Sequence, residues 1–201
     1  MFFTSNIEAT LKPLGMTPLG TSNSKFTVPA IHHIPTNTYM MDSTPISQFL
    51  ERTYPNPSLP LSTDWGQEIE KKARGLLGPV LRTSIVPREI LILSPRSQDY
   101  FRRTREEAFG RRLEELLDEG KEEEMGRELD GEMVGVGGMM RRDAGGAGFV
   151  FGEEPCYTDF LIAGAMESVR MVDEGIFQRM VKYRGFSDVY TACLPLMEKN
   201  D

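Results

Sequence analysis

The sequence predicts an α/β unit followed by an all-α domain. Two β-rich segments precede residue 42, and three prolines fall within residues 54–60. Proline cannot continue a helix or donate to a sheet ladder, so this stretch is read as an extended connector. Beyond it the apolar residues recur at helical spacing only. We therefore expect an α/β domain at 1–55, a linker at 56–63 and an all-helical domain at 64–201.

The α/β domain is expected to contain a short helix, a hairpin and a second helix. Apolar residues at helical spacing predict a helix over 6–14, which Pro13 and Gly15 stop early. Residues 26–33 and 38–41 favour strands, and the turn residues between them predict a β-hairpin. A further helix is expected from Asp42–Ser43 through about Thr53, with Ser favoured at its start.

The second domain is expected to hold helices of unequal stability. A helix over 64–93 should bend at Gly78–Pro79 and at Pro87. The next begins at Ser94–Pro95, and its apolar stripe runs on to Leu117. Five glycines predict a weaker helix over 121–142. The remainder is expected to be a glycine-rich loop at 143–148, an apolar central helix at 155–172 and short helices at 174–183 and 186–194.

Composition excludes several classes of protein. Acidic residues outnumber basic ones by 30 to 23 among 201 residues, giving a net charge of −7, which argues against a nucleic-acid partner. No apolar stretch approaches the roughly 18 residues of a membrane span, and the first residues lack the basic region of a signal peptide. Two cysteines without a CxxC motif argue against a disulfide framework. We expect a protein of the cytoplasm with no membrane partner.

Val28–Pro29 is the first candidate for function. A proline in a strand marks an edge, a bulge or a cis peptide bond. A cis bond would turn the Val28 backbone toward a ligand, whereas an ordinary proline at the end of a strand would have no such role. Both readings are open from local sequence.

Asp42–Ser43 is the second candidate. The Ser43 hydroxyl and the free N–H groups of a helix start could hold a carboxylate, and Asp42 could meet an ammonium group beside it. The pair could thus bind the zwitterionic end of an amino acid. The alternative is a plain helix cap.

The remaining nucleophiles and metal ligands are less suggestive. His32 and His33 are neighbours on a strand and point to opposite faces, so no metal site is expected there, although one of them could line a pocket. Cys156 would be a nucleophile only if something lowered the pKa of its thiol. A buried or capping thiol is the favoured reading.

Five segments in this order resemble the glutathione S-transferase superfamily, and most closely its fungal type related to bacterial β-etherases. The resemblance covers nearly the whole chain and rests on residues 6–15, 26–31, 41–50, 100–110 and 155–160. Members normally begin with a strand and a helix that carry the residue that activates the thiol. This chain starts at about the second strand, so the resemblance implies a truncated thioredoxin-like N-terminal domain before a helical C-terminal domain.

The resemblance also implies a cofactor and its contacts. Glutathione would be held by Val28, Pro29, Asp42 and Ser43, and Lys25 would meet its glycyl carboxylate. A small hydrophobic substrate would lie against the helices of residues 64–117, and a homodimer is expected. No catalytic residue can be assigned, although Thr4 or Ser5 could serve as a hydroxyl donor in place of the missing element.

Three functional readings are open. The first is an enzyme that conjugates the glutathione thiol to an electrophile, or adds it reversibly to an alkene and so isomerises trans to cis, in fungal secondary metabolism. The second is a glutathione transferase-like binding or regulatory protein without catalysis. The third is a fragment of a longer protein.

Overall fold

The computed structural model of the chain describes residues 7–17, 26–61, 63–142, 145 and 148–197. These residues divide into two compact units. One contains the described residues up to Ser58 together with Leu93–Arg105, and the other contains Leu59–Ile92 and the residues from Glu106 onward. Residues 56–61 form neither helix nor strand. The domain boundaries expected from sequence remain a prediction.

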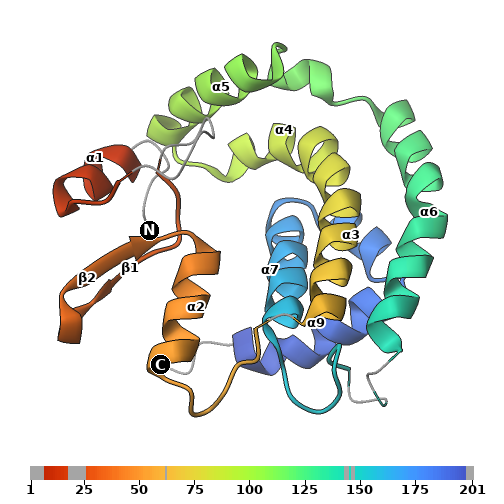
Figure 1. Cartoon of the computed structure of the whole chain (residues 1–201). Helices are drawn as coiled ribbons and strands as arrows, with labels where there is room; N and C mark the ends of the chain where they lie inside the picture. Colours follow the sequence, from red (N-terminus) through yellow and green to blue (C-terminus); the bar gives the residue numbers. More distant parts are fainter. Residues whose placement is uncertain (1–6, 18–25, 62, 143–144, 146–147, 198–201) are drawn as a thin grey trace. The chain divides into compact units, whose positions relative to one another are not determined.

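The first unit has the predicted order of helix, hairpin and helix (Figure 1). Helix α1 (Ile7–Leu11) continues into a short 3₁₀ turn, η2 (Lys12–Leu14). Strands β1 (Ala30–His33) and β2 (Thr38–Met41) pair antiparallel with Ala30 opposite Met41. The 3₁₀ turn η3 (Ile34–Thr36) joins them, and α2 (Ser43–Thr53) follows directly.

The two faces of the hairpin are covered by different helices. Leu11 of α1 packs with Phe26 and Met41 in a small apolar cluster on one face. His33 lies on the opposite face, where its ring meets Phe49 of α2 edge-on at 4.9 Å between centroids. Because side chains alternate between the two faces of a strand, α1 can pack on one face of the hairpin and α2 on the other.

The first helices of the second unit form one bent path. Helix α3 (Asp64–Val80) runs into a π turn, η4 (Leu81–Ile85), then α4 (Val86–Glu89) and the 3₁₀ turn η5 (Ile90–Ile92). Pro79 lacks an N–H and its ring crowds the preceding turn. The wider turn that follows accommodates this defect. The predicted bend is confirmed.

One expectation for the middle of the chain is wrong, and another is untested. Helix α5 (Pro95–Phe109) ends eight residues before Leu117, because Gly110 adopts a left-handed φ of +64° and terminates it. A 3₁₀ turn, η6 (Leu113–Leu116), carries the rest of the apolar stripe. The helix expected over 121–142 is present as α6 (Glu119–Arg141), which is unbroken over 23 residues despite its glycines; its lower stability stays a prediction.

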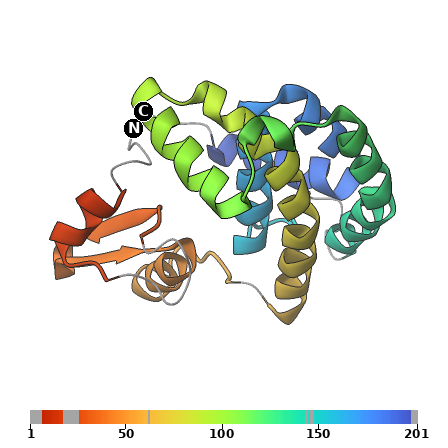
Figure 2. The ribbon, with the colours of Figure 1, turned by 90° about the horizontal axis from the view of Figure 1, so that it is seen from above.

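The C-terminal helices surround α7. Helices α7 (Tyr157–Val172), α8 (Glu174–Met180) and α9 (Arg184–Met197) agree with prediction. Helix α7 contacts α3, α8 and α9, and its place beside α3 can be followed in Figures 1 and 2. Its residues Ile162, Ala163 and Met166 are completely buried. Among the described residues, no helix is long and apolar enough to cross a membrane.

Candidate functional site

The hairpin brings the two predicted candidates to one end of the first unit. The backbone N–H of Asp42 donates to the carbonyl of Pro29 at 3.1 Å, which extends the pairing of β1 and β2 by one residue. Val28 precedes this pair and Ser43 follows it. The Val28–Pro29 bond is cis, which is one of the two readings left open by the local sequence. The Val28 side chain is 55 % exposed, so this end of the hairpin is open to a ligand.

Asp42, and not Ser43, caps helix α2. Its carboxylate oxygen Oδ1 accepts a hydrogen bond from the Thr44 N–H at 3.1 Å. Its backbone has φ +76° and ψ 132°, a conformation that costs a residue other than glycine about 1–3 kcal/mol. An unfavourable backbone held by its surroundings is typical of functional positions, so this value supports the candidate.

Ser43 keeps its hydrogen-bonding groups available. Of the first three residues of α2, Thr44 has its N–H bonded to Asp42 and Pro45 has no N–H. Within the part of the chain that the structure describes, the N–H and hydroxyl of Ser43 have no partner, and the residue is exposed. The positive end of the helix dipole adds to these two donors. These groups can donate hydrogen bonds to an anion.

Three residues named from sequence lie outside the described residues. They are Lys25, Thr4 and Ser5.

The histidines lie on opposite faces of β1, as predicted. His33 is buried, with Nδ1 at 2.6 Å from the Thr36 hydroxyl and Nε2 at 2.7 Å from the Tyr54 hydroxyl. His32 stacks on Tyr39 with 4.0 Å between ring centroids. Both ring nitrogens of His33 are thus occupied in the structure. No group of three or more metal-ligating side chains occurs among the described residues.

Cys156 is a structural residue. It is buried and forms the start of α7. Asp159 accepts hydrogen bonds from the Cys156 and Val150 N–H groups, both at 2.8 Å. Burial, followed by the hydrogen bond and charge of Asp159, raises the pKa of the Cys156 thiol to about 12. Burial also raises the pKa of the Cys193 thiol to about 12. Neither cysteine supplies a thiolate at neutral pH.

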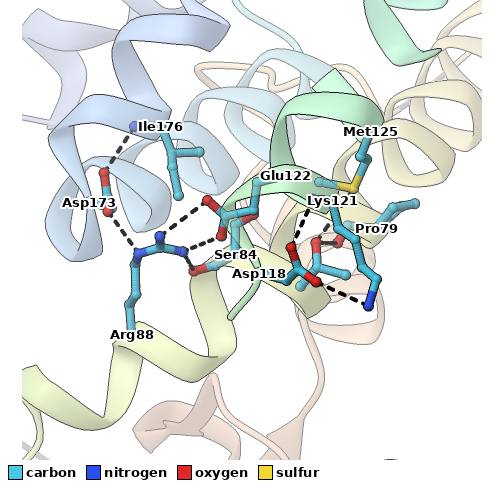
Figure 3. Close-up of polar contacts among 10 residues, drawn as sticks. Pro79, Ser84, Arg88, Asp118, Lys121, Glu122, Met125, Asp173 and Ile176 are labelled. Atoms are coloured by element: carbon cyan, nitrogen blue, oxygen red, sulfur yellow. Dashed lines mark hydrogen bonds and ion pairs between the residues drawn. The ribbon is translucent and has the colours of Figure 1, made fainter. Parts of the chain in front are cut away.

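Sequence reasoning missed a charged network in the second unit (Figure 3). Arg88 of α4 donates two parallel hydrogen bonds to the nearly buried Glu122 of α6, and a third to the Ser84 carbonyl at 2.7 Å. Its Nε lies 3.1 Å from Asp173 at the start of α8. The guanidinium thus joins three helices and is occupied by these contacts. Partners so far apart in the chain leave no local sequence signal.

Comparisons with known proteins give a consistent result. The family model of the glutathione S-transferase C-terminal domain matches residues 69–184. A glutathione S-transferase-like protein of Aspergillus flavus, ustS, is 33% identical over 172 residues. That match covers 78% of this chain and 62% of the relative, so the chain spans less than two thirds of the relative's length.

Solved structures of two fungal glutathione transferases share the fold. A glutathione transferase of Phanerochaete chrysosporium is 24% identical, with a TM-score of 0.82, over 100% of this chain and 83% of its own. A glutathione S-transferase of Ceriporiopsis subvermispora, solved in complex with glutathione, is 25% identical with a TM-score of 0.80. Its match covers 97% of this chain and 82% of that protein.

Proposed function

Because the chain belongs to the glutathione S-transferase superfamily, we propose that it binds glutathione beside Val28 and Ser43 and presents the thiol to a small hydrophobic electrophile. The predicted fold class is confirmed: a short thioredoxin-like part with a two-stranded sheet precedes a helical C-terminal domain. The observation that carries the proposal is the Asp42–Pro29 backbone hydrogen bond, which holds both candidate segments at one end of the hairpin.

Each group of the peptide would have a matching partner. The γ-glutamyl carboxylate would accept from the Ser43 N–H and hydroxyl at the positive end of α2. The neighbouring ammonium would meet the Asp42 carboxylate. Among the described residues, this carboxylate accepts one hydrogen bond, from the Thr44 N–H to Oδ1. The Val28 backbone would pair with the cysteinyl residue. Lys25 is proposed for the glycyl carboxylate.

The nucleophile would be the thiol of glutathione itself. The raised pKa values of Cys156 and Cys193 leave no protein thiolate among the described residues at neutral pH. A free thiol has a pKa near 8.5, so nearby N–H and hydroxyl donors are needed to raise the thiolate fraction. We propose that backbone donors share this role, with Thr4 or Ser5 contributing.

Two outcomes are compatible with this chemistry. Conjugation would join the sulfur permanently to the electrophile. Reversible addition to a conjugated alkene, rotation about the new single bond and elimination would isomerise the alkene without consuming thiol. We propose a role of this kind in fungal secondary metabolism, in the cytoplasm and as a homodimer. The likeness to ustS of A. flavus, a fungal protein, supports the fungal setting.

A binding protein without catalysis is the second candidate. Turnover of a glutathione-dependent substrate, such as an aromatic halide, by the purified chain would separate the two candidates.

The test of the glutathione site is calorimetry on a pair of serine variants. Ser43→Ala removes charge-assisted hydrogen bonds of about 1.5–3 kcal/mol and should weaken glutathione binding about tenfold or more. Ser47→Ala is the matched control, because its hydroxyl is committed to the Thr44 carbonyl in the same helix. Equal affinity for the wild type and Ser43→Ala would remove the site assignment.

A further inference from the structure

The second unit contains a cavity of about 70 Å³ between α6, α8 and the turn η4. Its wall lies within residues 80–84, 122–133 and 176–183, which belong to one compact unit. Gly126 and Arg179 are the exposed residues of this wall, so the cavity opens to solvent beside them. Figure 3 labels Ser84, Glu122, Met125 and Ile176 of the wall. Its apolar part is formed by Val80, Met125, Leu129, Met133, Ile176 and Met180.

Glycine at position 126 keeps this space open. Gly126 shares one face of α6 with Glu122 and Leu129, because residues three and four positions apart lie on the same side of a helix. A Cβ added at Gly126 would meet nothing within 4 Å. Alanine there would favour the helix and reduce the cavity, and an unfilled apolar cavity lowers stability. Packing of the helices therefore does not require the glycine, and the space it leaves can take a ligand.

Three methionines make the wall of the cavity adaptable. Met125 and Met133 belong to α6, and Met180 is the last residue of α8. Methionine side chains are unbranched and polarizable, so they can rearrange around a bound molecule. A wall of this kind can admit an apolar chain of varied length.

The charged groups around the cavity differ in their availability. Glu122 accepts hydrogen bonds from Arg88 on both carboxylate oxygens. Asp130, beside the cavity, accepts a hydrogen bond from the Tyr183 hydroxyl at 2.9 Å. Arg179 forms no hydrogen bond or ion pair within the described part of the chain. Its planar guanidinium matches the two oxygens of a carboxylate. The opening of the cavity therefore offers a binding group for an anion.

The apolar wall and the guanidinium together select the class of ligand. A wholly polar ion would gain nothing from the wall, and Arg179 would repel a cation. A carboxylate beside the exposed guanidinium keeps part of its hydration, so its desolvation costs less than in a closed site. The chain attached to it gains about fourfold in affinity for each methylene group that leaves water.

We propose that the cavity between α6 and α8 binds a short-chain carboxylic acid as its anion, with the alkyl chain among the three methionines and the carboxylate at Arg179. The wall shares no residue with the contacts proposed for glutathione. The cavity is therefore a second site, and its assignment does not depend on glutathione binding.

The first experiment titrates the full chain with hexanoate and follows the methionine methyl groups by NMR. The signals of Met125, Met133 and Met180 should shift together and reach saturation in the millimolar range. The exposed Met171 lies outside the wall and should not shift. Acetate lacks four methylene groups of hexanoate and should bind at least about tenfold more weakly.

Two substitutions test the protein side. Gly126→Leu places a side chain in the cavity and should weaken hexanoate binding about tenfold or more. Gly131→Leu is the matched control, because Gly131 lies in the same helix outside the wall and a Cβ there also meets nothing within 4 Å. Arg179→Gln should weaken hexanoate binding about tenfold and leave hexanol binding unchanged, since the alcohol carries no charge. If Gly126→Leu fails to fold by circular dichroism, the exposed substitution Arg179→Gln decides.

Four results would overturn the proposal. The first is the absence of saturable shifts in the three methionines at high millimolar hexanoate. The second is equal weakening of hexanoate binding in Gly126→Leu and Gly131→Leu. The third is an equal loss of hexanoate and hexanol binding in Arg179→Gln. The fourth is loss of hexanoate binding in Ser43→Ala, which would place the ligand in the proposed glutathione site instead.

Discussion

Gly185 of α9 lies against the backbone of Gly137 in α6. A Cβ placed on Gly185 would overlap the carbonyl oxygen of Gly137, and a Cβ on Gly137 would lie 3.3 Å from the Gly185 nitrogen. A side-chain movement can relieve neither contact, because the nearest atoms on both sides belong to the backbone. The crossing of α6 and α9 therefore requires glycine at 185, whereas a Cβ at 137 would need the Gly185 backbone to shift by a few tenths of an ångström.

Gly185→Ala should lower the free energy of unfolding by about 3 kcal/mol, at the upper end of the usual cost of overpacking. Urea denaturation followed by circular dichroism measures the change. Gly138→Ala is the control in α6, since an added Cβ there meets nothing within 4 Å. It should be neutral or stabilising by up to about 1 kcal/mol, because alanine has the higher helix propensity. Equal changes in the free energy of unfolding for Gly185→Ala and Gly138→Ala would contradict the close contact between α6 and α9.

Cys156→Ser should raise the melting temperature. Serine accepts a hydrogen bond from a helix N–H better than a thiol does, and a good cap contributes about 1 kcal/mol. Calorimetric melting gives the comparison. Cys193→Ser serves as the control, because Cys193 is fully buried inside α9 and a hydroxyl there should be destabilising. A lower melting temperature for Cys156→Ser would show that burial of the sulfur outweighs its capping.

The thiols should make stability fall at alkaline pH. Their pKa is raised from 9.0 to about 12 in the folded chain. As the pH rises, the thiols of the unfolded chain therefore lose their protons before those of the folded chain. The contribution of the two thiols to the free energy of unfolding is fully present below pH 9 and is lost between about pH 9 and 12. Urea denaturation across this range, compared with Cys193→Ala, measures the loss. A thiolate absorbance that appears near pH 9 in the folded chain would contradict it.

Breaking the pair of Arg88 and Glu122 should be costly. Arg88→Met leaves the nearly buried Glu122 carboxylate without its bidentate partner, and loss of one member of a buried pair costs about 3–5 kcal/mol. Lys121→Met is the matched control from the exposed pair with Asp118, where about 1 kcal/mol or less is expected. Chemical denaturation of both variants and of Glu122→Gln completes the comparison. Equal losses in Arg88→Met and Lys121→Met would refute the role of the network.

The sequence by itself determined the features that depend on neighbouring residues. The turn residues between 33 and 38 predict the hairpin, Pro79 predicts the bend after α3, and Ser–Pro at 94–95 predicts the start of α5. Each of these signals acts through a fixed backbone angle, a missing N–H or the alternation of a strand. The resemblance to the glutathione S-transferase superfamily also joined Val28–Pro29 and Asp42–Ser43 as one candidate site.

Tertiary structure alone decided what depends on residues that are distant in the chain. Helix propensity predicts a weak helix around Gly137, but contact with Gly185 makes that glycine an advantage, and α6 runs unbroken. The two carboxylates that bind Arg88 lie 34 and 85 positions away in the chain. Asp42, and not Ser43, is the N-cap residue of α2. The hydrogen bond from its N–H to the Pro29 carbonyl fixes the Asp42 backbone and leaves the Ser43 hydroxyl available. Helix propensities differ by about 1 kcal/mol or less between most residues. The free energies of close packing and of buried ion pairs are larger, and they arise only when segments distant in the chain come into contact.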